Sequence, residues 1–278
     1  MGGWPRSDLA ILCSRGTKAE MDRHLIKDFW DRLNSSTPAR IALGRVGASL
    51  PTHEVLGFSM AHARARDAVH ALFDRDKVSL EIQALGYQTL LADSAAPDRA
   101  AFLRRPDWGR KLSPASRVHL AGLQMPPADL AIIVADGLSA AAIHAQAVPF
   151  LTAFQPWIAR AGWSVAPVVI ARQARVALGD EIGELLHAKI AILLVGERPG
   201  LSSPDSLGIY LTYAPTRGRN DGERNCISNV REQGLSHDLA AFKLAWLVDQ
   251  ALKRGLTGVA LKDEADMMLI EGGAPQMT

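Results

Sequence analysis

The sequence is poor in cysteine and in aromatic residues, and its charges nearly cancel. Only two of its 278 residues are cysteines, Cys13 and Cys226, too few for a disulfide framework and at a separation that matches no zinc motif. A reducing, cytoplasmic compartment is therefore expected. Lysine and arginine number 31 against 29 acidic residues, a net charge of +2, so nothing in the composition indicates a general nucleic-acid-binding protein.

Long hydrophobic runs are also absent. The most apolar stretch, residues 189–195 (KIAILLV), has the length of one buried strand, whereas a membrane-spanning helix needs about 18 apolar residues. The N-terminal residues lack the long apolar stretch and the cleavage site of a signal peptide. We therefore expect a soluble protein. The apolar fraction of 48% and the length fit one large globular domain or two modest ones.

The N-terminal part is predicted to be helical and rich in loops. Residues 34–52 are rich in Ser, Thr, Gly and Pro, which places them at the surface. Thr52 can then cap a helix that runs to about residue 74. The expected organisation is a weakly ordered leader at residues 1–35, a helical and loop-rich region at 36–115, a Rossmann-like domain at 116–263 and a flexible tail at 264–278.

The C-terminal part shows short apolar runs that alternate with helical stretches. Such runs are typical of strands in a parallel sheet that is buried on both faces. The predicted fold class is therefore α/β, with a Rossmann-like, open and mainly parallel sheet. The strand-like runs are residues 130–135, 165–171, 189–195 and 209–213, and the helical stretches are residues 139–160, 179–187 and 236–254.

Ligands of open α/β sheets bind beyond the carboxyl ends of the strands. Three segments lie at such ends: residues 136–139, 172–176 and 195–206. The third is long and rich in Gly, Pro and Ser, and it carries Glu197 and Arg198 at its start. Opposite charges there suit a polar ligand, although both residues could equally be solvated loop residues.

Familiar catalytic signatures are missing. The sequence contains no G-x-G-x-x-G, no Walker loop and no H-E-x-x-H. Ser139 follows Gly137 after a predicted strand, but Ala141 stands where a nucleophile elbow needs glycine, so a helix N-cap is the favoured role. The scattered histidines show no metal-ligand spacing. Cys226 is expected in a polar loop, in a setting compatible with a ligand site. No catalytic residue and no metal ligand is assigned.

The segments 194–201 (LVGERPGL) and 225–229 (NCISN) resemble the light chain (small subunit) of ethanolamine ammonia-lyase. Further similarity lies at residues 136–139 (DGLS), at Arg40 with residues 44–47 (GRVG), and at residues 105–110 (RPDWGR). The resemblance runs from about residue 36 to residue 255, in family order. It does not extend to the leader or the tail.

The resemblance implies a subunit of an adenosylcobalamin-dependent lyase that converts ethanolamine to acetaldehyde and ammonia by a radical mechanism. It implies a heavy chain with a TIM-type barrel that holds ethanolamine, and a hetero-oligomer of heavy–light pairs. The family's cobalamin contacts fall on Val176, Glu197 and Cys226. The spacing from Glu197 to Cys226 is about one residue shorter than in some members of the family. Both a free cytoplasmic enzyme and enclosure in a bacterial microcompartment stay open.

The sequence also lacks the D-x-H-x-x-G motif with which other corrinoid domains supply a histidine to cobalt. We therefore expect the cofactor's own benzimidazole to remain the lower cobalt ligand. Two other classes of protein are alternatives: a self-sufficient α/β enzyme with a nucleotide-type cofactor or with Ser139 as nucleophile, and a non-catalytic corrinoid-binding module. Arg45 and Arg110, which lie beside glycines, are interpreted as contacts to the heavy chain or cofactor, or as part of a solvated basic face.

Overall fold

The computed structural model describes residues 37, 39–41 and 43–266, so the predicted leader and Cys13 lie outside the described residues, as does most of the predicted tail. The chain divides into two units, Met1–Ala61 and His62–Thr278. In the first unit, the described residues before Pro51 are largely exposed and form a turn closed by Val46 and Ser49. The helix α3 (Thr52–His70) begins where the sequence predicts a helix and ends a turn earlier than predicted.

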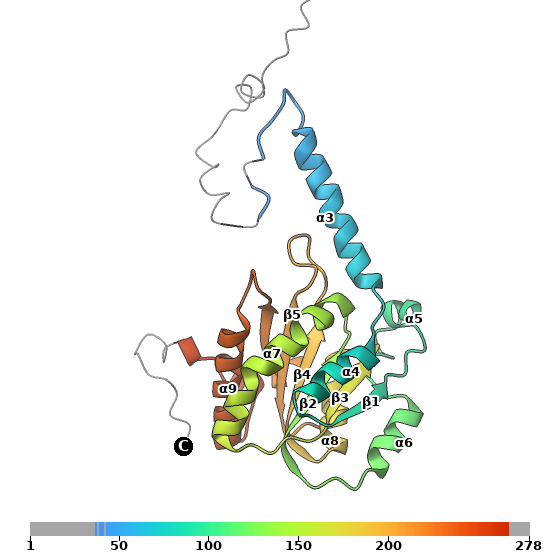
Figure 1. The fold of residues 1–278 in the computed structure, drawn as a ribbon, viewed down its shortest axis with the longest axis vertical. Coiled ribbons are helices and arrows are strands. Elements are labelled where there is room, and N and C mark those ends of the chain that lie inside the picture. The colour runs from blue at the N-terminus through green and yellow to red at the C-terminus, as the bar shows by residue number, and fades with distance from the viewer. Residues whose placement is uncertain (1–36, 38, 42, 267–278) are drawn as a thin grey trace, which may run out of the picture. The chain divides into compact units, whose positions relative to one another are not determined.

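The second unit contains a six-stranded sheet with the strand order β1-β3-β2-β4-β5-β6 (Figure 1). The first four strands of this order run parallel. The last two are antiparallel to their neighbours. The predicted class, α/β with an open and mainly parallel sheet, is confirmed. The strands are β1 (Thr89–Asp93), β2 (Ala128–Ala135), β3 (Val168–Arg172), β4 (Ala188–Gly196), β5 (Leu207–Tyr213) and β6 (Asn225–Val230).

Helices cover both faces of this sheet (Figure 1). The helices α4 (Arg75–Ala84), α7 (Ala140–Ala161) and α9 (His237–Arg254) pack on one face. The helices α6 (Pro114–Gly122) and α8 (Leu178–Leu185) pack on the other. Shorter elements complete the unit: α5 (Arg99–Arg104), η2 (Asp221–Glu223) and η3 (Gly258–Ala260).

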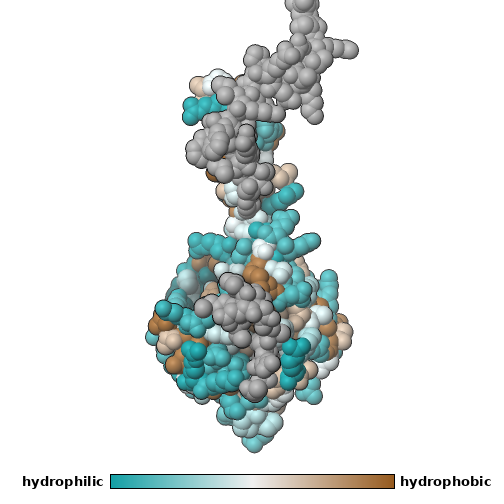
Figure 2. All heavy atoms as spheres, turned by 90° about the vertical axis from the view of Figure 1, so that its left-hand side faces the viewer, coloured by the Kyte–Doolittle hydropathy of each residue, from teal (hydrophilic) through white to brown (hydrophobic). Residues whose placement is uncertain are grey.

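Alternating side chains of the central strands explain the two-sided burial. In β2, Ile132 and Val134 point into the core beneath α7, whereas Ile133 points into the core beneath α8. All three side chains are fully buried, which is why this strand reads as a continuous apolar run rather than as an alternating one. On the face drawn in Figure 2, hydrophilic side chains predominate over the sheet-containing unit, and the hydrophobic side chains there form separate groups.

The sequence prediction missed both edge strands. β1 lies in the region predicted to contain only helices and loops, because this strand has just five residues and only Ala92 is fully buried. β6 carries Cys226, which was expected in a polar loop; that expectation was wrong. Only Ile227 and Val230 of β6 are buried, and the rest of this edge strand has the polar composition of a loop.

Ser139 caps α7, as the sequence predicts. Its Oγ accepts a hydrogen bond from the backbone N–H of Ala142 at 3.2 Å and donates one to the carbonyl oxygen of Pro204 at 2.9 Å. The side chain is fully buried. The hydroxyl therefore provides a hydrogen-bond partner for the first turn of α7 and holds the loop after β4 in place. It is not free to act as a nucleophile.

Replacement of Ser139 by Ala should lower the free energy of unfolding by about 1–2 kcal/mol, because a cap and a buried hydrogen bond are both lost. Urea denaturation followed by tryptophan fluorescence measures the effect. Thr152→Ala on the exposed side of α7 is the matched control and should leave stability nearly unchanged. Equal midpoints for the two variants would contradict the capping role.

Candidate functional site

The loops after β2, β3 and β4 meet at the end of the sheet where these parallel strands finish. β2 lies between β3 and β4, so the chain runs outward from β2 to β3 and then back across β2 to β4. At such a reversal the connecting helices leave on opposite faces, and a crevice opens between the loops. The segments 136–139, 172–176 and 195–206, predicted from the sequence to lie at strand ends, therefore come together here.

Asp136 links two of these loops. It is only 3% exposed, and its Oδ1 accepts a hydrogen bond from the backbone N–H of Ala174 at 3.3 Å. The Arg99 guanidinium lies 3.5 Å from its other oxygen and also donates to the carbonyl oxygen of Gly137 at 2.7 Å. Burial raises the pKa of the Asp136 carboxyl to about 6, against the opposing effect of Arg99.

Gly137 and Gly196 allow the loops after β2 and β4 to touch. The N–H of Leu138 donates to the carbonyl oxygen of Gly196 at 2.8 Å. A Cβ at Gly196 would lie 2.0 Å from the carbonyl oxygen of Ser139, and Gly137 adopts a positive φ of 53°. Only glycine fits such a backbone contact without displacement. The pairs Asp136–Gly137 and Val195–Gly196 therefore form the base of the crevice.

An open pocket of about 450 Å³ occupies this edge. Its size is within the range of small-molecule sites. Val176 and Glu197, two of the three residues singled out from the sequence, both line it. The full lining is Gly137, Leu138, Ala174, Arg175, Val176, Val195, Gly196, Glu197, Arg198 and Tyr210.

Glu197 is half-buried and held in place from two sides. Its Oε2 accepts a hydrogen bond from the Ser206 hydroxyl at 2.5 Å and one from the backbone N–H of Asn229 at 3.3 Å. These hydrogen bonds fix the position of the Glu197 side chain, although the residue lies in a loop and is only half-buried. Arg198, in contrast, is exposed at the rim of the pocket.

Cys226 lies beside the pocket rather than in its lining. It pairs with Tyr210 across the antiparallel ladder of β5 and β6, and Tyr210 lines the pocket. Burial raises the pKa of the Tyr210 hydroxyl, and the neighbouring Cys226 and Glu197 raise it further. Burial also raises the pKa of the exposed Cys226 thiol. At neutral pH both groups are therefore protonated and can act as hydrogen-bond donors.

A second, strongly basic pocket of about 570 Å³ adjoins the first and shares Arg175 and Val176 with it. Arg110, one of the two loop arginines singled out from the sequence, lines this second pocket. Arg45 lies in the other unit, where its side chain is exposed.

Sequence reasoning placed Asp136 and Arg175 in segments expected at the site but did not single them out, and it missed Tyr210. Arg175 lies in a segment that was correctly expected at the site. The sequence could not reveal that this residue lines two adjoining pockets. Tyr210 lies in a predicted strand, where an aromatic residue suits the core as well as a site. Asp136 directly follows a buried strand, which is a usable signal for a residue that organises a strand-end site.

Two further observations concern metal-binding groups and membrane-spanning helices. Within residues 37–266, as far as they are described, no group of three or more His, Cys, Asp or Glu side chains is arranged to hold a metal ion. Among the described helices, none combines the length and the apolar character needed to cross a membrane.

Fold and pocket together define an α/β protein with an open pocket between the loops at its strand ends. Comparison with known protein families identifies the family to which the chain belongs. The family model for "ethanolamine ammonia-lyase light chain (EutC)" matches residues 27–262. The chain therefore belongs to the ethanolamine ammonia-lyase light chain family.

Individual relatives agree with this assignment. A protein of Pseudomonas syringae pv. tomato, named ethanolamine ammonia-lyase small subunit, is 54% identical over 245 residues, 87% of this chain and 85% of its own. Proteins of the same name from Pseudomonas aeruginosa and Bradyrhizobium diazoefficiens are 52% and 55% identical. These matches cover 92% of this chain and 96% of the relative in the first case, and 84% and 90% in the second.

Stability should fall as pH rises through the titration of Asp136. Because the folded-state pKa of about 6 lies above the ordinary value of 3.8, the folded protein binds this proton more tightly than the unfolded chain does. The free energy of unfolding should therefore decrease by on the order of 2–3 kcal/mol between about pH 4 and pH 7. The variant Asp136→Asn should lack this part of the decrease.

Urea denaturation at a series of pH values measures both proteins. Asp67→Asn, which alters an exposed carboxylate of α3, is the control and should retain the wild-type slope. A parallel pH dependence of wild type and Asp136→Asn would show that Asp136 does not titrate in this range.

Proposed function

We propose that this chain is the small subunit of an adenosylcobalamin-dependent ethanolamine ammonia-lyase. The reaction converts ethanolamine to acetaldehyde and ammonia by a radical mechanism. In this proposal a heavy chain with a TIM-type barrel binds ethanolamine and carries most of the catalytic groups, and this chain contributes part of the cobalamin site. The single observation that carries the proposal is the open strand-end pocket in which Val176 and Glu197 meet, in a member of this family.

The residues of the pocket suit a corrin ring with its fringe of amide side chains. Such a ligand needs dispersed donors and acceptors and an apolar contact, rather than a compact catalytic cluster. Ser206 and Asn229 both donate to Oε2 of Glu197, which leaves Oε1 to accept a hydrogen bond from an amide. Val176 supplies apolar surface, and the protonated Tyr210 and Cys226 can donate at the edge of the pocket.

The openness of the pocket supports a role shared with a second subunit. When bound, adenosylcobalamin supplies a cobalt–carbon bond whose homolysis starts the radical reaction. The residues of this chain bind and orient that group, and none of them is assigned a catalytic role. We propose an assembly of heavy–light pairs in the cytoplasm, either free or enclosed in a bacterial microcompartment.

The buried position of Ser139 argues against the alternative of a self-sufficient hydrolase-like enzyme. Its hydroxyl is hydrogen-bonded to the Pro204 carbonyl oxygen and to the Ala142 N–H, with no exposed surface. A non-catalytic corrinoid module stays the second candidate class, and it is separated from the first by activity of the assembled protein.

Co-production of this chain with the large subunit should give acetaldehyde release that depends on added adenosylcobalamin. Glu197→Gln should raise the KM for adenosylcobalamin about tenfold, because a charged acceptor is replaced by a neutral one, with little change in kcat. Glu264→Gln at an exposed position outside the pocket is the control. The proposal fails if acetaldehyde release needs no cobalamin, or if release proceeds equally with the large subunit alone.

We propose further that the benzimidazole of the cofactor remains the lower cobalt ligand. Neither strand-end pocket of the described residues is lined by a histidine, so this part of the chain offers no imidazole to the metal. Electron paramagnetic resonance of the cob(II)alamin form should therefore show hyperfine splitting that is unchanged when the histidines of both subunits are labelled with nitrogen-15. A changed splitting would assign a protein histidine to cobalt instead.

A further inference from the structure

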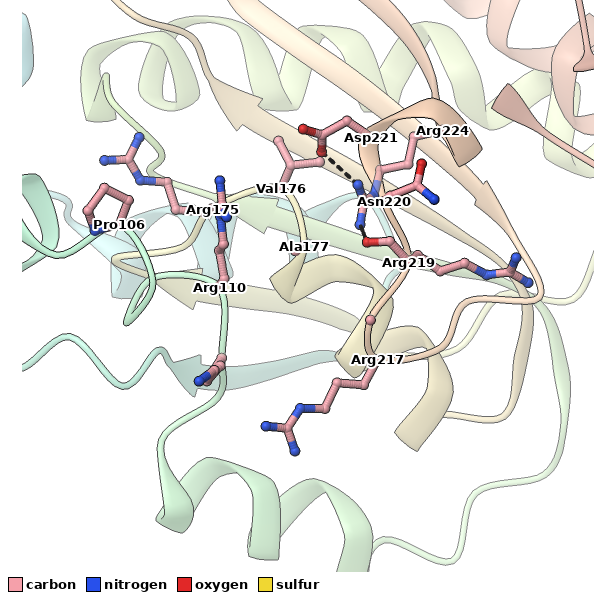
Figure 3. A pocket seen from close by; sticks show the side chains of 12 residues that line it. Pro106, Arg110, Arg175, Val176, Ala177, Arg217, Arg219, Asn220, Asp221 and Arg224 are labelled. Carbon is pink, nitrogen blue, oxygen red and sulfur yellow. Dashed lines mark hydrogen bonds and ion pairs between the residues drawn. The ribbon is translucent and has the colours of Figure 1, made fainter. Parts of the chain in front are cut away.

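Side chains from separate segments of the chain line the basic pocket beside the proposed corrin site (Figure 3). Arg110 and Arg175 reach it from the segments next to α5 and after β3, whereas Arg217, Arg219 and Arg224 come from the segment between β5 and β6. Lys111, Pro106, Val176, Ala177, Gly218, Asn220 and Asp221 complete the lining.

The carboxylates around this pocket neutralise only part of its positive charge. Arg224 is buried and bonds to Asp180 and to Asp221, the single carboxylate of the lining. Arg219 pairs with Glu223 at 2.5 Å. The other four cations of the lining make no ion pair with the residues that the structure describes. They are Arg110, Lys111, Arg175 and Arg217.

Two arginines of the lining are incompletely hydrogen-bonded within the protein. The buried Nε atoms of Arg175 and Arg219 have no hydrogen-bond partner among the described residues. Burial lowers the pKa of Arg175, and the like charges of Arg99, Arg110 and Arg198 lower it further. Asp136 offsets part of this repulsion, and an anion placed beside Arg110 and Arg175 would relieve more of it.

The backbone holds these cations in place. The N–H of Arg175 donates to the carbonyl oxygen of Gly109 at 2.8 Å, and a Cβ at Gly109 would lie 2.8 Å from the Arg175 side chain and from Phe102. The R-P-D-W-G-R motif therefore fixes Arg110 relative to Arg175. On the other side, the N–H of Arg217 donates to Glu184 at 2.9 Å.

The N-terminus of α8 lies beside the pocket but adds little to its positive charge. Its N-cap, Ala177, lines the pocket, yet the first N–H groups of the helix already donate to backbone carbonyl oxygens, and the buried Asp180 and Glu181 lie in its first turn. The guanidinium groups of the lining carry the match to phosphate, whose oxygens a guanidinium group can bind in a bidentate manner. A single carboxylate would leave most of the four unpaired cations without a partner.

We propose that this pocket binds the phosphate group of a small molecule. Two sources share this chemistry: the phosphodiester that links the nucleotide tail of adenosylcobalamin, and a free phosphate compound. The first source rests on the proposed function, because Arg175 and Val176 belong to both pockets and a ligand over one pocket can extend into the other. The second source does not depend on it.

The test uses the complex of both subunits with the double variant Arg110→Gln and Arg217→Gln. Both side chains are exposed and make no ion pair among the described residues, so the fold should be retained, as far-UV circular dichroism checks. Arg254→Gln, at the exposed end of α9, is the matched control. Equilibrium dialysis measures inorganic phosphate, and difference absorption measures adenosylcobalamin and adenosylcobinamide, which lacks the nucleotide and its phosphodiester.

Two results support the proposal. A loss of about tenfold or more in affinity for inorganic phosphate in the double variant alone assigns a free phosphate compound. A similar loss for adenosylcobalamin, with adenosylcobinamide bound as in the wild type, assigns the cofactor's phosphodiester.

Two results overturn it: unchanged binding of all three probes, and an equal loss for both corrinoids without an effect on phosphate. If neither the wild-type complex nor the variants bind a corrinoid, the proposed function fails. The phosphate measurement then still decides whether the pocket is an anion site.

Discussion

The burial of the parallel sheet on both faces is the constraint on which the rest of the structure depends. Helices α4, α7 and α9 cover one face and α8 with α6 the other, so most side chains in the middle of the central strands are buried beneath helices. Tyr210 of β5 is an exception, because it lines the pocket. Polar groups therefore meet mainly where strands end. The reversal of chain direction around β2 brings three such ends together, and the pocket lined by Val176 and Glu197 lies there. The basic pocket adjoins it and extends to the segment between β5 and β6.

The same edge shows how a site without a catalytic cluster is kept in shape. Asp136 ties the loop after β3 to the end of β2, and the Gly137–Gly196 contact ties in the loop after β4. Glu197 then links the start of the third loop to its end and to β6. Each link joins segments that are far apart in the sequence, so the pocket forms only when the sheet is complete.

The sequence alone predicts the central strands and the helices between them, because residues such as Ile132 and Ile192 form continuous apolar runs that only two-sided burial explains. It also predicts Ser139 as a cap and the placement of Val176 and Glu197 at one edge. It does not predict β1 and β6, whose few buried residues give no pattern. Nor does it predict the basic pocket, because Arg110, Arg175 and Arg217 converge only through tertiary contacts.

The chemistry of Cys226 has a consequence for handling and for survival of the protein in air. Cys226 lies on an edge strand, opposite Tyr210 of β5. Burial of the sulfur and the negative charge of Glu197 raise the pKa of this thiol, against a hydrogen bond with Tyr210 that lowers it. The thiolate is the form that oxidants attack, so oxidation to a sulfenic acid should be slower at residue 226 than at a cysteine that is fully surrounded by water.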